Sequence, residues 1–417
     1  MKKILGLALL ASVFTTSAFA SVARLEALGE DQFGSQYVDD NRNAFLNAAT
    51  INDHFDYTTF EWGDTNSVIN AEGTPKAQGG IFRKSGRYVY GVYFGADSNT
   101  GASLRSGIFS ALAQTGAMTQ VQANVLASQA QNENTISFFL GGESLWKWGA
   151  RVEFAGATNE QGITSGGVTI EEVNKKGWLA GLGAIKGKNE VYLNLGTGNE
   201  LEYKNIAGLA TGPSPDPTTA ATGGVLFNGN DYEFKGKLGY QFGYVRSLDN
   251  GAKAFVEYRS QEVEEDGIDA LDEVWKIQRL DIGWAKTSKL NDKFTAFYKA
   301  IYHTSKQENF VFLDQDDDVE ESFLKTTVGF EIMAKDWLIF RGSIASNLFG
   351  EEQNADGDKS TIADSTDVRL GATLAFGDFA IDGLIGNDAD GNGIAGDDNG
   401  TIRTDALMSR VSMTYKF

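Results

Sequence analysis

Basic side chains occur among the alternate, non-apolar positions of segments that have the pattern of β-strands. Alternate residues of a strand face opposite sides, so the run WKWGARVEF at 146–154 sets Trp146 and Trp148 against Lys147 and Arg151. Isolated charges cannot be buried in a dry interior, whereas charged side chains line the pores of channels. The alternation therefore predicts a water-filled passage with these lining residues: Lys147, Arg151, Lys235, Lys237, Arg259, Arg341, Arg369 and Arg410.

The alternative is a lumen that is closed. Bases outnumber acids on the predicted inner face, and an internal segment could pair with them in place of water. The stretch at 96–133 has apolar residues at helical spacing, among them Leu104, Ile108 and Leu112. It is a candidate constriction element inside the lumen, or else a helical cap over the outer rim.

Acidic residues are concentrated in four polar stretches, at 262–273, 307–321, 350–367 and 386–401, where Lys359 is the one base. The chain as a whole has a net charge of −20, so these stretches hold most of the excess and would form an acidic rim. An acidic surface repels phosphates, which argues against nucleic acid as a partner.

One acidic stretch has the spacing of a calcium loop. Asp388, Asp390 and Asn392 with Gly393 match the first half of an EF-hand loop, in which oxygen ligands alternate along a tight turn. The twelfth position is Asn399 rather than the bidentate Glu. The pattern indicates a candidate Ca²⁺ site in an external loop, with a solvated acidic loop as the alternative, and no other cofactor is expected.

Catalytic residues are sparse. The two histidines are His54 and His303, and neither has a nucleophile at a recognisable spacing. Glycine runs fall in strands and turns rather than between a strand and a helix, which argues against a phosphate-binding loop. We therefore expect no enzymatic activity.

The segments that position these residues alternate between tight turns and long polar loops. Gly, Asn and Asp supply the backbone angles that hairpins need, and seven such turns lie at 84–86, 143–144, 186–189, 249–251, 290–292, 335–336 and 377–378. Longer stretches, such as 198–230, separate them. Seven hairpins with one strand at either end give about sixteen strands, with fourteen as the alternative. This asymmetry predicts an all-β chain that forms a transmembrane antiparallel β-barrel.

The last strand, at 407–417, supports this fold class. Apolar residues ending in Tyr415 and Phe417 alternate with polar ones, as in a lipid-facing barrel wall. The terminal Phe417 with Tyr415 two residues before it resembles the C-terminal strand of bacterial outer-membrane barrels. The resemblance implies that both residues belong to a signal read by the barrel assembly machinery. An edge strand of a soluble sheet is the alternative.

Residues 1–20 have the pattern of a secretory signal peptide. Lys2 and Lys3 precede an apolar run, and Ala18-Phe19-Ala20 is an A-x-A cleavage site. The chain has no cysteine, so no disulfide is available in an oxidising compartment. The expected divisions are the signal peptide at 1–20, an N-terminal segment at 21–53 and the barrel at 54–417.

The segment at 21–53 carries a second resemblance. Asp39, Asp40, Phe45, Asn47 and Ala49 are similar to the N-terminal signature of fatty-acid-transporter-like outer-membrane barrels, although Ala48 stands where that family has proline. The resemblance implies a hatch inside the barrel. A short periplasmic helix before the first strand is the alternative.

The sequence as a whole predicts a general porin in the bacterial outer membrane that passes small hydrophilic solutes or ions. The alternatives are a channel for hydrophobic substrates with an N-terminal hatch, and a structural or adhesive surface barrel. Expected partners are outer-membrane lipid, lipopolysaccharide and the assembly machinery. Resemblance to porins implies a homotrimer.

Overall fold

A computed structural model describes residues 21–63, 77–96, 104, 134–159, 163–165, 168–170, 172–211, 224–266, 274–308, 318–353, 357–362, 366–387 and 407–417. The described part of the chain begins with three short helices: α1 (Val22–Ala27), α2 (Asn43–Leu46) and the 3₁₀ helix η1 (Ala48–Asn52). The strands of the first half are β1 (Tyr57–Gly63), β2 (Gln78–Ser85), β3 (Tyr88–Phe94), β4 (Asn134–Glu143), β5 (Lys147–Asn159), β6 (Ile163–Ser165), β7 (Val168–Ile170), β8 (Glu172–Lys186), β9 (Asn189–Thr211) and β10 (Gly224–Gly236). Those of the second half are β11 (Gly239–Ser247), β12 (Ala252–Asp266), β13 (Val274–Asn291), β14 (Phe294–Glu308), β15 (Val319–Lys335), β16 (Leu338–Gln353), β17 (Lys359–Thr361), β18 (Asp367–Phe376), β19 (Phe379–Asn387) and β20 (Leu407–Lys416).

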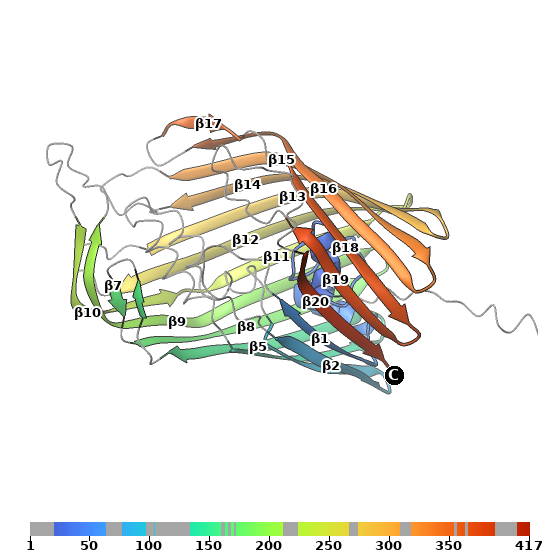
Figure 1. The fold of residues 1–417 in the computed structure, drawn as a ribbon, viewed down its shortest axis with the longest axis horizontal. Helices are drawn as coiled ribbons and strands as arrows, with labels where there is room; N and C mark the ends of the chain where they lie inside the picture. Colours follow the sequence, from blue (N-terminus) through green and yellow to red (C-terminus); the bar gives the residue numbers. More distant parts are fainter. Residues whose placement is uncertain are drawn as a thin grey trace, which may run out of the picture.

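The strands form one closed antiparallel barrel (Figure 1). The ring closes where β1 pairs with β20, from Tyr57 opposite Lys416 to Gly63 opposite Arg410. Short strands β6, β7 and β17 lie in loops, and β10 and β11 are successive parts of one wall strand because both pair with β9 and β12. The described wall therefore has sixteen strands, which confirms the predicted fold class.

The turns on one side of the barrel are short, as predicted. The seven expected turns join β2–β3, β4–β5, β8–β9, β11–β12, β13–β14, β15–β16 and β18–β19. Gly86, Gly187, Gly251 and Gly377 lie in these turns with φ between 60° and 77°, a region that glycine adopts without steric cost.

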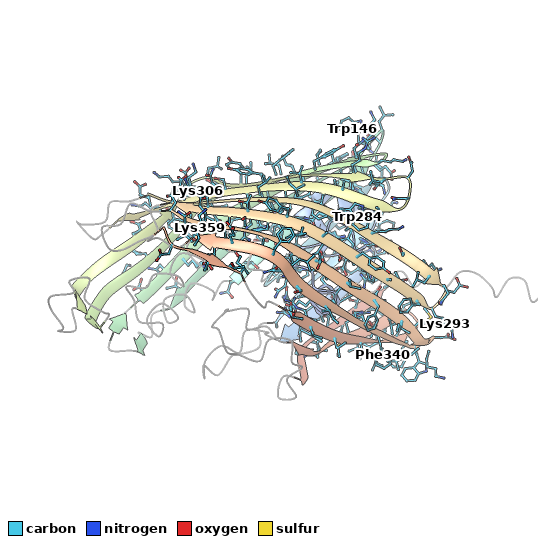
Figure 2. The ribbon with its side chains drawn as sticks, turned by 90° about the horizontal axis from the view of Figure 1, so that it is seen from above. Trp146, Trp284, Lys293, Lys306, Phe340 and Lys359 are labelled. Carbon is cyan, nitrogen blue, oxygen red and sulfur yellow. The ribbon has the colours of Figure 1, made fainter. Side chains whose placement is uncertain are left out.

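The outer face of the wall is apolar. Phe60, Phe138, Ile282 and Val328 on separate strands are 52–60% exposed, and five tryptophans are 37–49% exposed. Figure 2 shows Trp146, Trp284 and Phe340 projecting from the outside of the ribbon. A closed barrel with an apolar exterior is suited to lipid, with tryptophans at its borders. The protein is thus a barrel of the bacterial outer membrane. Within the described residues no helix is long and apolar enough to cross a membrane.

One sequence prediction about the wall is wrong. Much of 198–230, expected to be a loop, is a paired extension of β9 and β10. Cross-strand ion pairs hold this region together, including Lys204 with Glu172 at 3.0 Å. The next wall strand is interrupted between β10 and β11, where the Lys237 N–H bonds to the Glu262 carbonyl at 2.8 Å.

Candidate functional site

Residues 21–53, called the hatch below, lie inside the ring of strands (Figure 1, blue). The hatch bonds to the wall on opposite sides of the lumen. The Val22 N–H bonds to Glu61 on β1, the Leu46 carbonyl accepts from Asn194 on β9, and the Ala27 carbonyl accepts from Ser343 on β16. Arg24 bonds to Glu331 on β15, and Asn52 bonds to the Trp148 carbonyl on β5. The hatch therefore extends across the lumen.

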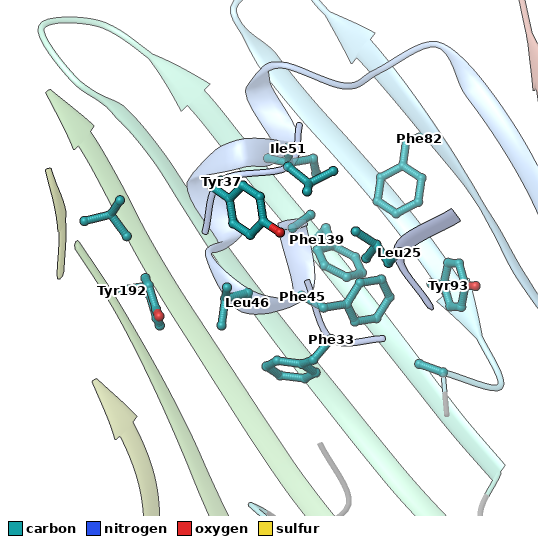
Figure 3. Packing of buried hydrophobic residues seen from close by; sticks show 14 of the residues in the cluster. Leu25, Phe33, Tyr37, Phe45, Leu46, Ile51, Phe82, Tyr93, Phe139 and Tyr192 are labelled. Atoms are coloured by element: carbon teal, nitrogen blue, oxygen red, sulfur yellow. The ribbon is translucent and has the colours of Figure 1, made fainter. Parts of the chain in front are cut away.

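An aromatic cluster joins the hatch to one side of the wall (Figure 3). The Phe45 ring of the hatch makes edge-on contacts with Tyr93 of β3 at 5.1 Å and Phe139 of β4 at 5.0 Å between centroids. The guanidinium of Arg42 lies 4.0 Å from the centre of the Phe45 ring. Elsewhere, Tyr37 meets Phe297 of β14 edge-on at 6.3 Å. Such aromatic pairs stabilise by about 0.5–1.5 kcal/mol each beyond their burial.

Glycines of the wall make room for η1. A Cβ on Gly149 would lie 2.0 Å from the Ala48 carbonyl oxygen, and one on Gly183 would lie 2.0 Å from Oδ1 of Asn47. A Cβ on Gly141 would lie 2.4 Å from the side chain of Ile51. Any larger residue at these positions on β5, β8 and β4 would push the hatch away from the wall.

On the other side of the lumen, ion pairs attach the hatch to the wall. Arg24 bonds to Glu331 Oε1 at 2.8 Å and to Asp40 Oδ2 at 2.9 Å. Lys299 of β14 forms an ion pair with Glu30, and Arg410 of β20 forms one with Glu26 at 3.1 Å. Burial raises the pKa of the Asp40 carboxyl to about 6, although the neighbouring Arg24 guanidinium favours its ionised form. These buried charges satisfy one another across the hatch–wall boundary.

Six of the eight predicted lining bases lie at or near this boundary. Arg151, 1% exposed, has its guanidinium 4.7 Å from the Phe33 ring. Arg341 pairs with Asp382 at 2.8 Å and with Glu331, the partner of Arg24, at 3.2 Å. Lys147 pairs with Asp53, Arg410 with Glu26, Arg259 with Glu257 and Arg369 with Asp367. In these contacts the bases bind carboxylates or rings, and their role as lining residues of an aqueous passage stays a prediction.

Lys235 and Lys237 differ from the other six. Their side chains are 43% and 42% exposed, and they pair with Glu233 at 3.0 Å and Glu264 at 3.5 Å. Both lie at the end of β10 or in the break that follows it.

The residues of the N-terminal signature build the hatch itself. Asp40 binds Arg24, and the Asp39 carboxylate lies 3.0 Å from the imidazole of His54. Phe45 is the centre of the aromatic cluster, and the Asn47 side chain accepts from the Ala49 N–H at 3.1 Å to cap η1. Sequence reasoning missed the acids Glu26 and Glu30, which face the inward bases. The sequence signal for these two acids was the excess of bases over acids among the inward-facing residues of the wall. Buried bases in excess require carboxylates from another segment.

Other predicted residues have separate outcomes. Leu104, from the stretch at 96–133, is buried in the same core as the hatch, and its carbonyl would lie 2.6 Å from a Cβ on Gly239. Tyr415 and Phe417 are 47% and 45% exposed at the closing strand, and their role in assembly stays a prediction. Asp388, Asp390 and Asn392 lie outside the described residues, within which no group of three potential metal ligands occurs. His303 is buried, with Nδ1 2.5 Å from Asp281 Oδ1.

Comparisons with known proteins give only distant likenesses. No family model and no curated protein matches the chain. Among solved structures, the CymD monoaromatic hydrocarbon channel is 10% identical, with 97% of this chain and 99% of that chain covered and a TM-score of 0.39. The toluene transporter TodX of P. putida is 13% identical, with 96% and 99% covered and a TM-score of 0.35. OmpT of Vibrio cholerae is 10% identical, with 87% and 95% covered and a TM-score of 0.34.

Replacing Arg24 by alanine should loosen the hatch. The change leaves buried Asp40 without its cation, and loss of one partner of a buried ion pair costs about 3–5 kcal/mol. We expect rapid tryptic cleavage after Arg42, which is 1% exposed in this structure. The matched control is Arg83→Ala, because Arg83 is 50% exposed beside Asp56 and such a pair is worth less than about 1 kcal/mol. Equal cleavage of the two variants would contradict the prediction.

Proposed function

We propose that this protein is an outer-membrane channel for small apolar compounds, and that the hatch closes it at rest. The observation that carries the proposal is the hatch itself, which bonds to the wall on opposite sides of the lumen. A solute must either displace this segment or pass between it and the wall. The proposal follows the hatch alternative raised by residues 39–49.

The apolar preference rests on the inward-facing aromatics. Tyr57, Phe82, Tyr93 and Phe139 are buried on the inner face of β1–β4, at 1–4% exposure. The interior of a water-filled barrel is generally polar, so this patch is unusual for a hydrophilic pore. The Phe45 ring fills the patch in the closed state, and an apolar or aromatic solute could replace it with similar contacts when the hatch moves.

A hydrophilic diffusion channel is the second candidate. It is favoured by the polar inner faces of β12–β14, where Arg259, Asp281 and His303 point into the lumen with Glu257. This candidate requires that the hatch move away from the charged side and leave a hydrated passage there.

Uptake by solute class separates the two candidates. Cells that express the protein, and cells with the empty vector, would be given a labelled monoaromatic hydrocarbon, a long-chain fatty acid and a small sugar. We expect faster entry of one or both apolar compounds in expressing cells and no change for the sugar. Faster entry of the sugar alone would favour the diffusion channel and contradict the apolar proposal.

A further inference from the structure

Glu61 is a buried carboxylate on the inner face of β1, with 1% of its surface exposed. Its Oε2 accepts from the Val22 backbone N–H at 3.0 Å and from Ser412 Oγ at 3.0 Å, and its Oε1 accepts from the Tyr93 hydroxyl at 3.4 Å. All three donors are neutral. Within the described residues no ion pair includes Glu61.

Two bases in this region are engaged with other groups. Arg410 pairs with Glu26 at 3.1 Å, and Nε of Arg42 donates to the Gln32 carbonyl at 3.0 Å. A carboxylate buried without a cation is strongly disfavoured. A cation placed within reach of Glu61 would therefore stabilise its ionised form.

The predicted cleavage site supplies such a partner. Hydrolysis of the Ala20–Ser21 amide consumes one water and leaves a carboxylate on Ala20 and an α-amine on Ser21. An α-amine has a pKa of about 8 and is largely protonated at neutral pH. Ser21 is buried, and it is the residue directly before Val22, whose N–H already bonds to Glu61. Ser21 also caps α1, since its hydroxyl accepts from the Arg24 N–H at 3.0 Å.

We propose that signal-peptide cleavage after Ala20 creates an α-ammonium on Ser21 that pairs with Glu61, and that this buried ion pair seats α1 and locks the hatch against β1. Before cleavage the same nitrogen is a neutral amide, so the lock forms only in the processed protein. The proposal deepens the proposed function, because it names what holds the hatch closed.

The test compares three processed proteins purified from membranes. Glu61→Gln keeps the acceptor and removes the charge. A glycine inserted between Ala20 and Ser21 moves the ammonium one residue away after cleavage, and the third protein combines both changes. Mass spectrometry verifies each N-terminus, and heat-modifiable migration on gels verifies that the barrel is folded. The readout is the rate of tryptic cleavage after Arg24 and Arg42, which are 4% and 1% exposed.

We expect each single change to raise the cleavage rate by roughly a hundredfold, in line with loss of a buried ion pair. The combined protein should be cleaved no faster than either single variant, because both changes remove the same interaction. Ser412→Ala is the control that removes a neutral donor from the same oxygen, and it should have a far smaller effect.

Effects that multiply in the combined protein, or an insertion without effect, would overturn the ion pair. This readout does not involve transport. Failure of the uptake test with the expected proteolysis pattern would therefore reject the proposed function alone, and the reverse result would reject the ion pair alone.

Discussion

Removal of residues 21–53 should turn a barrel that is silent in a planar bilayer into one with steady open steps. The variant would join the signal peptide directly to His54, three residues before β1 begins. A sixteen-stranded barrel is wide enough to hold a column of water, and the hatch bonds to the wall on opposite sides of that lumen. Mean ionic conductance should rise by roughly an order of magnitude or more.

The full-length protein is the control for this deletion, and heat-modifiable migration shows whether the shortened wall still closes. A folded but silent variant would contradict the prediction. In that case, another element would close the lumen, and the stretch at 96–133 would be the first to test, because Leu104 is buried in the same core.

A disulfide between the hatch and the wall should abolish uptake. A Cβ built on Gly371 of β18 lies 2.7 Å from the Cβ of Ala27 in α1. A disulfide needs about 3.5–4.5 Å between these atoms, so a shift of about 1 Å admits one. Because the chain has no cysteine, Ala27→Cys with Gly371→Cys would have a single possible pairing. Oxidised protein should lose nearly all uptake of the transported solute, and a reductant should restore it.

The two single-cysteine variants control this experiment, since each carries one change but cannot form the internal bond. Uptake that continues through the oxidised double variant would show that solutes pass without movement of α1. That result would confine the moving part of the hatch to residues nearer to Phe45.

The sequence predicted the wall well because residue alternation and turn residues act between near neighbours in the chain. Alternation along β5 and β20 identified the two faces, and glycines at Gly86, Gly187 and Gly377 marked the turns. The break between β10 and β11 could not be predicted in this way. It lies beside Gly239, where the carbonyl of Leu104 approaches the wall, and this contact joins parts of the chain far apart in sequence.

The site was harder to predict because its two halves come from distant segments. The alternation of residue types placed Arg151, Arg341 and Arg410 on the inner face of the wall. Their surroundings, however, include Phe33, Glu26 and Arg24 of the hatch. Two sequence signals favoured a filled lumen: the inward glycines at 141, 149 and 183, and the inward aromatics of β1–β4. The calcium ligands and the homotrimer remain predictions.

The pairing of β1 with β20 also constrains the order of assembly. Residues 57–63 must find residues 410–416, a contact between the two ends of the wall, and contacts so distant in sequence form slowly. The hatch directly precedes β1, yet its ionic partners Glu331 and Arg410 lie in strands made late in the chain. Because the hatch is synthesised before the wall, its apolar and charged surface is available to the last strands before the ring closes.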